Sequence, residues 1–295
     1  MRFDFIRQEK KAFPVTTLCK VMKVSRSGFY RYLKQLDQPE PDNDGDLKAM
    51  VGEIFEASKR TYGSRRMSRA LRKLGFDVGR YQARNLMRKL GLKVLPTKRF
   101  KVTTNSRHSY PVAPNLLDRQ FDVETVNRVW GTDITYLWTQ EGAPCEQGEL
   151  YLAVVVDLCS RKVVGWALDK CMTAEFTIRA LTMAVWLRRP EHGLLHHSDR
   201  GSQYASHEYQ QKLEEYGMTC SMSRKGDCWD NAVVERFFRS LKTERTNHCI
   251  YQTREAAKRD VIDYIEMFYN CKRLHSYLGY LSPNEYEGLA LEQAA

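Results

Sequence analysis

Three acidic residues stand where strand and helix patterns seldom place a carboxylate. Asp133 lies inside a segment rich in Thr, Tyr, Trp and Ile, which predicts a strand, although aspartate is depleted in strands. Asp199 follows a short apolar strand pattern and begins a loop, which is where α/β sheets bind their ligands. Glu235 lies on a predicted helix, with Arg239 and Lys242 one and two turns later on the same face. Each acid taken alone is more often a cap, a turn residue or an ion-pair partner.

Together, the three acids are a donor set suited to a hard divalent cation. Such cations, Mg²⁺ for example, bind carboxylate oxygens and keep water and substrate phosphates as their other ligands. Two such ions, about 3.5–4 Å apart, can activate the attacking oxygen of a phosphodiester reaction and stabilise the leaving oxygen. Lys242 could then contact a DNA phosphate, and a solvated helix face is the alternative interpretation of Arg239 and Lys242.

The second part of the chain alternates strand and helix patterns. Strands are predicted over 129–138, 150–156, 162–168, 194–197 and 219–223, and helices over 173–189, 206–216, 231–245 and 253–271. This order predicts an α/β fold with a mixed sheet. The segment Asp157–Arg161 predicts a hairpin turn, so Asp157 is interpreted as a turn residue and not as a further catalytic acid.

The first part of the chain predicts small helices. Residues 1–45 hold two short helical patterns joined by a brief turn, which makes this segment a helix-turn-helix candidate. Residues 46–92 predict three more helices and form a basic, helical DNA-binding domain. Residues 93–126 have no clean period and contain several prolines, which predicts a linker. The remaining residues, 127–295, are expected to form a catalytic core with C-terminal helices.

Arginines follow two of the helices in the basic domain. Ser64 is expected to cap one of them and Gly91 to end the other. Along the second, arginines recur every fourth residue and line one face, so this helix could lie along a DNA groove with its guanidinium groups on phosphates. The residues predicted to bind DNA are Arg65, Arg66, Arg69, Arg72, Arg80, Arg84, Arg88 and Lys242.

The net charge of the 295-residue chain is +11 and is unevenly distributed. Residues 1–126 hold 27 Lys and Arg against 13 Asp and Glu, whereas residues 127–295 hold 20 against 23. Between Lys59 and Arg119 the basic residues are mostly arginine, which suits bidentate contacts to phosphate. A basic block beside a nearly neutral domain favours nucleic-acid binding over a role in solubility alone.

The composition excludes several classes of protein. With 42% hydrophobic and 28% charged residues, the chain is close to the globular average, which excludes disorder over most of its length. Its longest wholly apolar run, Leu150–Val156, is far shorter than the ~20 residues that a membrane-spanning helix needs. Charged residues near the N-terminus interrupt any secretory signal. The 8 cysteines are scattered without a CxxC pair, so we expect a reduced, cytoplasmic protein without a zinc site.

Other candidate residues receive structural interpretations. Asp227 and Asp230 precede the Glu235 helix and are interpreted as loop and N-cap residues. His196 and His197 are adjacent on a predicted strand, so they face opposite sides of the sheet and do not readily share a metal ion.

The acidic motifs and their spacing resemble the DDE transposases of the insertion-sequence-three family, specifically the product of their second reading frame, OrfB. The matching segments are WGTDITY at 130–136, HSDRGSQY at 197–204, DNAVVERFF at 230–238, LKTE at 241–244 and a closing motif within 269–283. Between Asp199 and Glu235 lie 35 residues, the spacing that the family shares with retroviral integrases, and Lys242 fits the family's trailing basic residue. The resemblance extends over nearly all of the chain, to about Tyr286.

This resemblance implies an RNase H-like mixed-sheet catalytic core preceded by a small all-α helix-turn-helix region. It implies that Asp133, Asp199 and Glu235 are the catalytic triad and hold Mg²⁺, as two ions, with Mn²⁺ as a substitute. The implied reaction is hydrolytic nicking at the end of an insertion sequence, which frees a 3′-OH that attacks another phosphodiester. In this family that attack is expected to join the two ends and later to produce a circular intermediate.

The implied partner is double-stranded DNA, both the terminal repeats of the element and its target. Pairing two DNA ends implies a homo-oligomer, at least a dimer, and the family implies a first-frame OrfA partner or a frameshift fusion with it. We expect a bacterial cytoplasmic protein that associates with the nucleoid when it is on DNA. Two alternatives stay open, namely an RNase H-like nuclease without strand transfer and a non-catalytic DNA-binding regulator of the element.

Overall fold

The computed structural model describes residues 2–37, 45–95, 110–141, 148–225 and 227–294. It divides into two compact units, Met1–Glu53 and Ile54–Ala295. Residues 38–44 and part of the predicted linker, residues 96–109, lie outside the described residues. No described helix is long and apolar enough to cross a membrane.

The first unit contains the helices α1 (Arg2–Glu9), α2 (Val15–Val21) and α3 (Arg26–Asp37), and the chain then enters α4 (Gly45–Ala57). The two short helices predicted here are therefore present as α2 and α3. Ile6, Leu18, Cys19 and Phe29 are buried together and form the small core of this unit. The Ser25 hydroxyl accepts a hydrogen bond from the backbone N–H of Gly28 at 3.1 Å, which caps α3.

The arginine-rich helices of the second unit are α5 (Ser64–Lys73) and α6 (Arg80–Lys89). Ser64 does not cap α5, contrary to the prediction, because Gly63 holds the N-cap position and makes no side-chain bond. Gly91 ends α6 as predicted. Its φ of +64° lets the chain reverse so that the N–H of Leu92 donates to the carbonyl of Met87 at 2.9 Å.

The core of the second unit is a five-stranded mixed sheet in the order β3-β2-β1-β4-β5. The strands are β1 (Val129–Trp138), β2 (Glu149–Asp157), β3 (Val163–Asp169), β4 (Leu195–Ser198) and β5 (Thr219–Met222). Strands β1, β2 and β3 pair antiparallel, whereas β4 runs parallel to both β1 and β5. All five predicted strands are present, so the predicted mixed α/β sheet is confirmed.

The turn between β2 and β3 is organised by Asp157. One carboxylate oxygen accepts from the N–H groups of Cys159 and Ser160 at 2.9 and 3.0 Å. The other accepts from the N–H of Asn127 at 2.6 Å and from the Trp130 indole at 3.2 Å. Its role as a hairpin residue is therefore confirmed.

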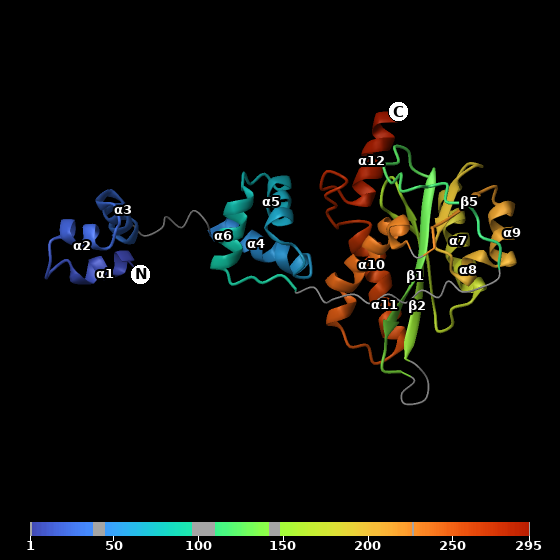
Figure 1. Ribbon diagram of the computed structural model, residues 1–295, viewed down its shortest axis with the longest axis horizontal. Helices are drawn as coiled ribbons and strands as arrows, with labels where there is room; N and C mark the ends of the chain where they lie inside the picture. The colour runs from blue at the N-terminus through green and yellow to red at the C-terminus, as the bar shows by residue number, and fades with distance from the viewer. Residues whose placement is uncertain (1, 38–44, 96–109, 142–147, 226, 295) are drawn as a thin grey trace. The chain divides into compact units, whose positions relative to one another are not determined.

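Helices cover both faces of the sheet (Figure 1). On one face, α7 (Ala174–Arg188), α8 (Ser202–Ala205) and α9 (His207–Glu215) bury Trp130, Val155 and Val164 of the sheet. On the other face, α10 (Ala232–Glu244), α11 (Arg254–Ile262) and the π-helical turn Asp263–Tyr269 bury Leu152, Val154 and Val156. Strand β2 is buried from both sides, which explains its continuous apolar sequence.

Among the described residues, five elements have no counterpart among the predicted helices. They are α1, α8, the 3₁₀ turns η1 (Cys228–Asn231) and η2 (Thr246–His248), and the C-terminal helix α12 (Pro283–Ala294). Helix α8 and the two 3₁₀ turns span at most 4 residues each, too few to show a period. Helix α12 carries a signal that could have been used, because Ser282 and Glu285 form a reciprocal capping box across its first turn.

Replacing Gly165 with alanine should destabilise the core. A Cβ at this position of β3 would lie 2.3 Å from the carbonyl oxygen of Ala180 on α7, so strand and helix would have to separate. We expect the free energy of unfolding to fall by about 1–3 kcal/mol, measured by urea denaturation. Gly288→Ala in α12 is the matched control, since a Cβ there meets nothing within 4 Å, and it should be neutral or stabilising. Equal stability of the two variants would contradict this packing argument.

Candidate active site

Strands β1 and β4 bring Asp133 and Asp199 to one end of the sheet. The two strands are parallel, and Gly131 pairs with His197 at the last position of their ladder. Asp133 and Asp199 each follow that pair by two residues, so the two aspartates leave the ladder at matching positions. Because the ladder ends there, β1 continues past Asp133 without β4 alongside. The carboxyl end of β4 is the edge at which α/β sheets bind ligands.

Glu235 reaches the same region through the close packing of α10 on β1. Gly131 has no side chain, and a Cβ there would lie 2.9 Å from the nearest methyl carbon of Val234. The Asn231 amide at the N-cap of α10 donates to the carbonyl of Thr132 at 3.0 Å, directly beside Asp133. These contacts hold the first turn of α10, which carries Glu235, against the middle of β1.

The three carboxylates influence one another electrostatically. Burial raises the pKa of Asp133 well above its ordinary value, and the negative charges of Asp199 and Glu235 raise it further. Burial also raises the pKa of Glu235. Lys242, two turns along α10, has its pKa lowered by burial, while the charge of Asp133 opposes that shift. The site therefore gathers negative charge that a cation would neutralise.

The donor set fits a hard divalent cation. One oxygen of Asp133 accepts from the N–H of Ile134 at 2.7 Å, and one oxygen of Asp199 accepts from the N–H of Gly201 at 2.9 Å. Among the described residues, no group of three or more His, Cys, Asp or Glu side chains is arranged so that it could hold a metal ion. Mg²⁺ can bind to fewer protein ligands, because one or two carboxylates together with water and substrate phosphates complete its shell.

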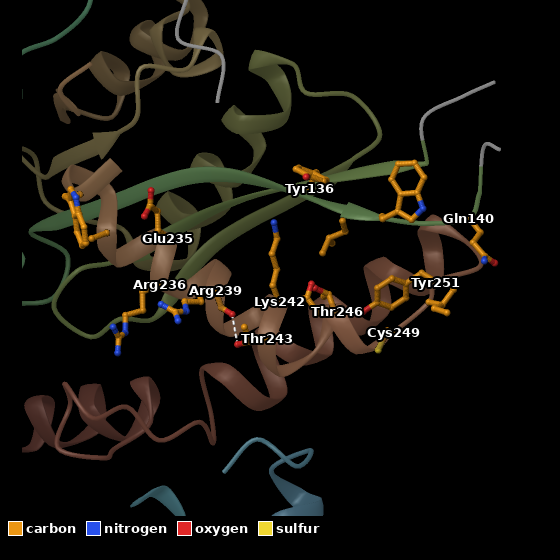
Figure 2. A pocket seen from close by; sticks show the side chains of 16 residues that line it. Tyr136, Gln140, Glu235, Arg236, Arg239, Lys242, Thr243, Thr246, Cys249 and Tyr251 are labelled. Atoms are coloured by element: carbon orange, nitrogen blue, oxygen red, sulfur yellow. Dashed lines mark hydrogen bonds between the residues drawn. The ribbon is translucent and has the colours of Figure 1, made fainter. Parts of the chain in front are cut away.

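A basic groove of about 930 Å³ leads away from Glu235 along α10. Figure 2 shows Glu235 at one end, Lys242 in the middle beneath Tyr136, and Gln140 and Tyr251 at the other end. The Lys242 ammonium lies 4.9 Å from the centre of the Tyr136 ring. The groove is lined by Tyr136, Leu137, Trp138, Gln140, Trp229, Ala232, Glu235, Arg236, Arg239, Lys242, Thr243, Thr246, Asn247, Cys249, Ile250 and Tyr251.

Glu244 anchors the far end of α10, a role that sequence reasoning missed. Its carboxylate accepts two hydrogen bonds from Arg273, both at 2.7 Å, one from Tyr264 at 2.9 Å and one from Arg66 at 3.2 Å. Burial by itself would raise the pKa of Glu244, but the charges of Arg273 and Arg66 hold it below its usual range. Glu244 and Arg273 belong to separate sequence motifs 29 residues apart. Their ion pair therefore becomes visible only in the folded structure.

The arginines predicted to bind DNA fall into two groups. Arg66 pairs with Glu244, Arg69 stacks on the Tyr280 ring with 5.1 Å between guanidinium carbon and ring centre, and Arg72 lies 3.7 Å from Asp77. Arg69 and Arg72 are nevertheless exposed, as are the remaining members, namely Arg65 on α5 and Arg80, Arg84 and Arg88 on α6. The exposed stripe on α6 leaves its guanidinium groups accessible, so DNA contact stays a prediction for these residues.

Asp230 departs from its predicted role as an N-cap or loop residue. Asp227 is an N-cap, since it accepts from the N–H of Trp229, but Asp230 is completely buried. Its carboxylate accepts from Arg224 at 3.0 Å and from Arg119 at 2.8 Å. The hydrogen bond from Arg224 is the largest cause that lowers the pKa of Asp230. The contact to Arg119 spans 111 residues, so no local pattern could have predicted it.

Comparison with known proteins identifies the family. An integrase core domain model matches residues 124–228, a second integrase core domain model matches residues 235–291, and an HTH-like domain model matches residues 41–100. The chain is 37% identical over 289 residues to the transposase InsF for insertion sequence IS3A of Escherichia coli, covering 97% of this chain and 98% of that one. The chain belongs to the IS3 family of insertion-sequence transposases.

A further relative and a solved structure are also similar to this chain. This chain is also 41% identical over 266 residues to the insertion element IS600 uncharacterized 31 kDa protein of Shigella sonnei. The match covers 90% of this chain and 96% of that one. Among solved structures, the chain matches the HTLV-2 integrase catalytic core domain in complex with magnesium at 20% identity and a TM-score of 0.41, covering 54% of this chain and 95% of that one. The predicted family, fold class and transposase activity are confirmed, and the HTH-like match implies DNA binding.

Removing the charge of Glu244 should destabilise the transposase strongly. In Glu244→Gln the buried guanidinium of Arg273 would keep its charge but lose its carboxylate partner. We expect the free energy of unfolding to fall by about 3–5 kcal/mol in chemical denaturation. Glu255→Gln is the control, because Glu255 and its partner Arg259 are exposed, and its cost should be below about 0.5 kcal/mol. A Glu244 variant as stable as this control would show that the buried pair does not hold α10.

Acidification should destabilise the fold through His275. Burial and the charge of Arg273 lower the pKa of His275 from 6.5 to about 2. Below pH 6.5 the unfolded chain binds a proton at this histidine that the folded chain does not, so the free energy of unfolding decreases as the pH falls. The contribution approaches about 1.4 kcal/mol per pH unit. Denaturation between neutral pH and about pH 5 should show a shallower pH dependence for His275→Gln than for the wild type. An unchanged slope, or the same change in the exposed-residue control His192→Gln, would contradict this assignment.

Proposed function

We propose that Asp133, Asp199 and Glu235 are the catalytic, metal-holding acids with which this transposase cleaves the 3′ ends of its insertion sequence and transfers them to new DNA. The observation that carries the proposal is the end of the β1–β4 ladder, where two aspartates leave matching positions beside the first turn of α10. Mutual charge effects on the pKa of Asp133 support the same grouping.

The cation proposed for this site is Mg²⁺, as two ions, with Mn²⁺ as a substitute. When bound, such ions activate the attacking oxygen and stabilise the charge on the leaving oxygen of a phosphodiester. Asp133, Asp199 and Glu235 would hold them, and the hydrogen bonds from Ile134 and Gly201 orient one oxygen of each aspartate before binding. The cationic Lys242 side chain, near Asp133, suits a phosphate of the same DNA strand.

The proposed reaction has two steps at the same acids. In the first, the oxygen of a water molecule attacks phosphorus at the end of the element, the bond to the 3′ oxygen breaks, and the leaving oxygen gains a proton. In the second, that new 3′-OH attacks another phosphodiester, forms a new bond to phosphorus and releases the 3′-OH of the receiving strand. Joining the two ends of the element and forming a circular intermediate are further parts of this proposal.

The helical regions are proposed to bring the DNA ends to these acids. The exposed arginines of α6 and Arg65 of α5 are placed to meet phosphates, and the HTH-like match covers both helices. Helices α2 and α3 of the first unit are a second proposed DNA-binding element. Two DNA ends require at least a dimer on DNA, and an OrfA partner or fusion is proposed to complete the assembly.

Substituting the acids should separate binding from chemistry. Asp133→Asn and Glu235→Gln should bind labelled duplex carrying the element's terminal repeats as tightly as the wild type, but should neither nick nor join it with Mg²⁺. Each loss should exceed about 10³-fold, because the ions lose a ligand, and chelation of the metal should have the same effect on the wild type. Asp157→Asn is the control acid, since Asp157 belongs to a hairpin turn.

Three results would redirect the assignment. Nicking without joining would favour a nuclease, and tight binding with no reaction in the wild type would favour a regulator or a subunit that needs its OrfA fusion. Joining by the Glu235→Gln variant at the wild-type rate would exclude Glu235 from the reaction.

The arginine stripe of α6, Arg80, Arg84 and Arg88, should make the affinity for DNA more strongly dependent on salt concentration. Replacing Arg80, Arg84 and Arg88 with glutamine should lower the slope of log affinity against log salt by about 0.9 for each phosphate that the variant no longer neutralises. A control with the same charge change replaces three exposed basic residues of the core, Arg128, Lys170 and Arg259. If both triple variants change the slope equally, the stripe has no dedicated role in binding phosphate.

A further inference from the structure

An exposed apolar pair lies at the end of the groove remote from Glu235. Trp138 is 63% exposed and Ile250 is 78% exposed, and both line the groove. A parallel bridge joins Thr139 to Tyr251, so the residues that precede them, Trp138 and Ile250, stand opposite each other. Thr139 and Tyr251 are buried, which turns their two predecessors outward. Trp138 and Ile250 thus form one apolar surface, here named the Trp138 platform.

The groove that leads to the platform is strongly cationic. Arg236, Arg239 and Lys242 line it, and Glu235 is the only acidic residue among its lining side chains in the described part of the chain. Figure 2 shows Lys242 between Glu235 and the end marked by Gln140 and Tyr251, with Arg236 and Arg239 nearer the Glu235 end. Its volume of about 930 Å³ suits an organic ligand of several rings or a short piece of chain.

A cationic groove that ends on an exposed aromatic ring is the combination that binds single-stranded nucleic acid. The cations follow the phosphates, and bases stack on the ring whatever their sequence. Bases inside a duplex already stack on their neighbours, so only an unpaired base presents a free face to the indole. The platform therefore suits a nucleotide outside the double helix.

The position of the platform defines which nucleotide this is. Asp133 and Trp138 are five residues apart on β1, roughly 17 Å at about 3.3 Å per residue. A strand that rises about 3.4 Å per nucleotide in duplex covers that length in about five nucleotides, and an extended strand covers it in fewer. The stacked base thus lies a few nucleotides from the phosphodiester at the acids.

We propose that the Trp138 platform stacks an unpaired base of the DNA strand whose reacting phosphodiester lies at Asp133, Asp199 and Glu235. This assignment rests on the proposed function of those acids. It adds that the transposase opens the DNA within a few base pairs of the cleavage point, with Arg236, Arg239 and Lys242 following the phosphates between acids and platform.

The binding experiment uses the full-length protein without metal and a 12-nucleotide single-stranded oligothymidine as the probe, with tryptophan fluorescence as one readout and anisotropy of a labelled probe as the other. Stacking on Trp138 should quench fluorescence. Trp138→Ala should weaken binding by about tenfold and remove the quenching. Trp138→Phe should bind within about twofold of wild type, because the aromatic face remains, but should also lose the quenching. Trp186→Ala is the control, since Trp186 is 73% exposed on α7 and does not line the groove.

A second measurement places 2-aminopurine at each of the last positions of the duplex end and compares wild type with Trp138→Ala. 2-Aminopurine at one position a few nucleotides from the cleavage point should change its fluorescence when the wild type binds, but not when Trp138→Ala binds. Equal oligothymidine binding by Trp138→Ala and Trp186→Ala would overturn the platform even if the wild type nicks and joins DNA. Reduced joining by Trp138→Ala with unchanged oligothymidine binding would also overturn it, in favour of a protein partner. Failure of wild-type joining, with quenching intact, would instead contradict the proposed function of the acids.

Discussion

The geometry of this transposase depends on the parallel pairing of β1 with β4 and on its abrupt end at Gly131 and His197. Up to that point the two strands share hydrogen bonds; beyond it each carries an aspartate two residues later. Gly131 takes part in two contacts. It forms the last pair of the ladder, and because it has no side chain, Val234 of α10 can approach β1. A single short ladder thus decides where two acids lie and where the helix of the third can pack.

The acids repel one another, so the rest of the core must compensate for placing them together. Burial and neighbouring charges raise the pKa of Asp133, which is the electrostatic cost of the grouping in the absence of a cation. Helix α10 is held at both ends. Asn231 bonds β1 at its start, and Glu244 bonds Arg273, Tyr264 and Arg66 at its end. The helix that carries Glu235 is thus held by contacts that lie away from the Glu235 carboxylate.

Two connections tie sequence-distant segments to the region of the acids. Arg66 of α5 bonds Glu244, so an arginine of the HTH-like region is part of the anchor of α10. Arg119 bonds the buried Asp230 of η1, so the segment that precedes the core is attached to the turn that leads into α10. Both bonds are charge-assisted, and the carboxylate side chain of each is at most 10% exposed, which makes them stronger than exposed ion pairs.

The sequence by itself determined the element types of the core and predicted which acids form the site. Period and composition predicted all five strands, because β-branched and aromatic runs have few alternatives, and the spacing of Asp133, Asp199 and Glu235 pointed to the family. Short helices such as α8 and η1 were not predicted, because four residues are too few to show a period. Only the tertiary structure decided that Asp230 is a buried ionic centre, that Arg66 faces Glu244, and that Trp138 and Ile250 share one surface. Each of these depends on contacts between residues about a hundred or more positions apart, which folding creates and which no local pattern records.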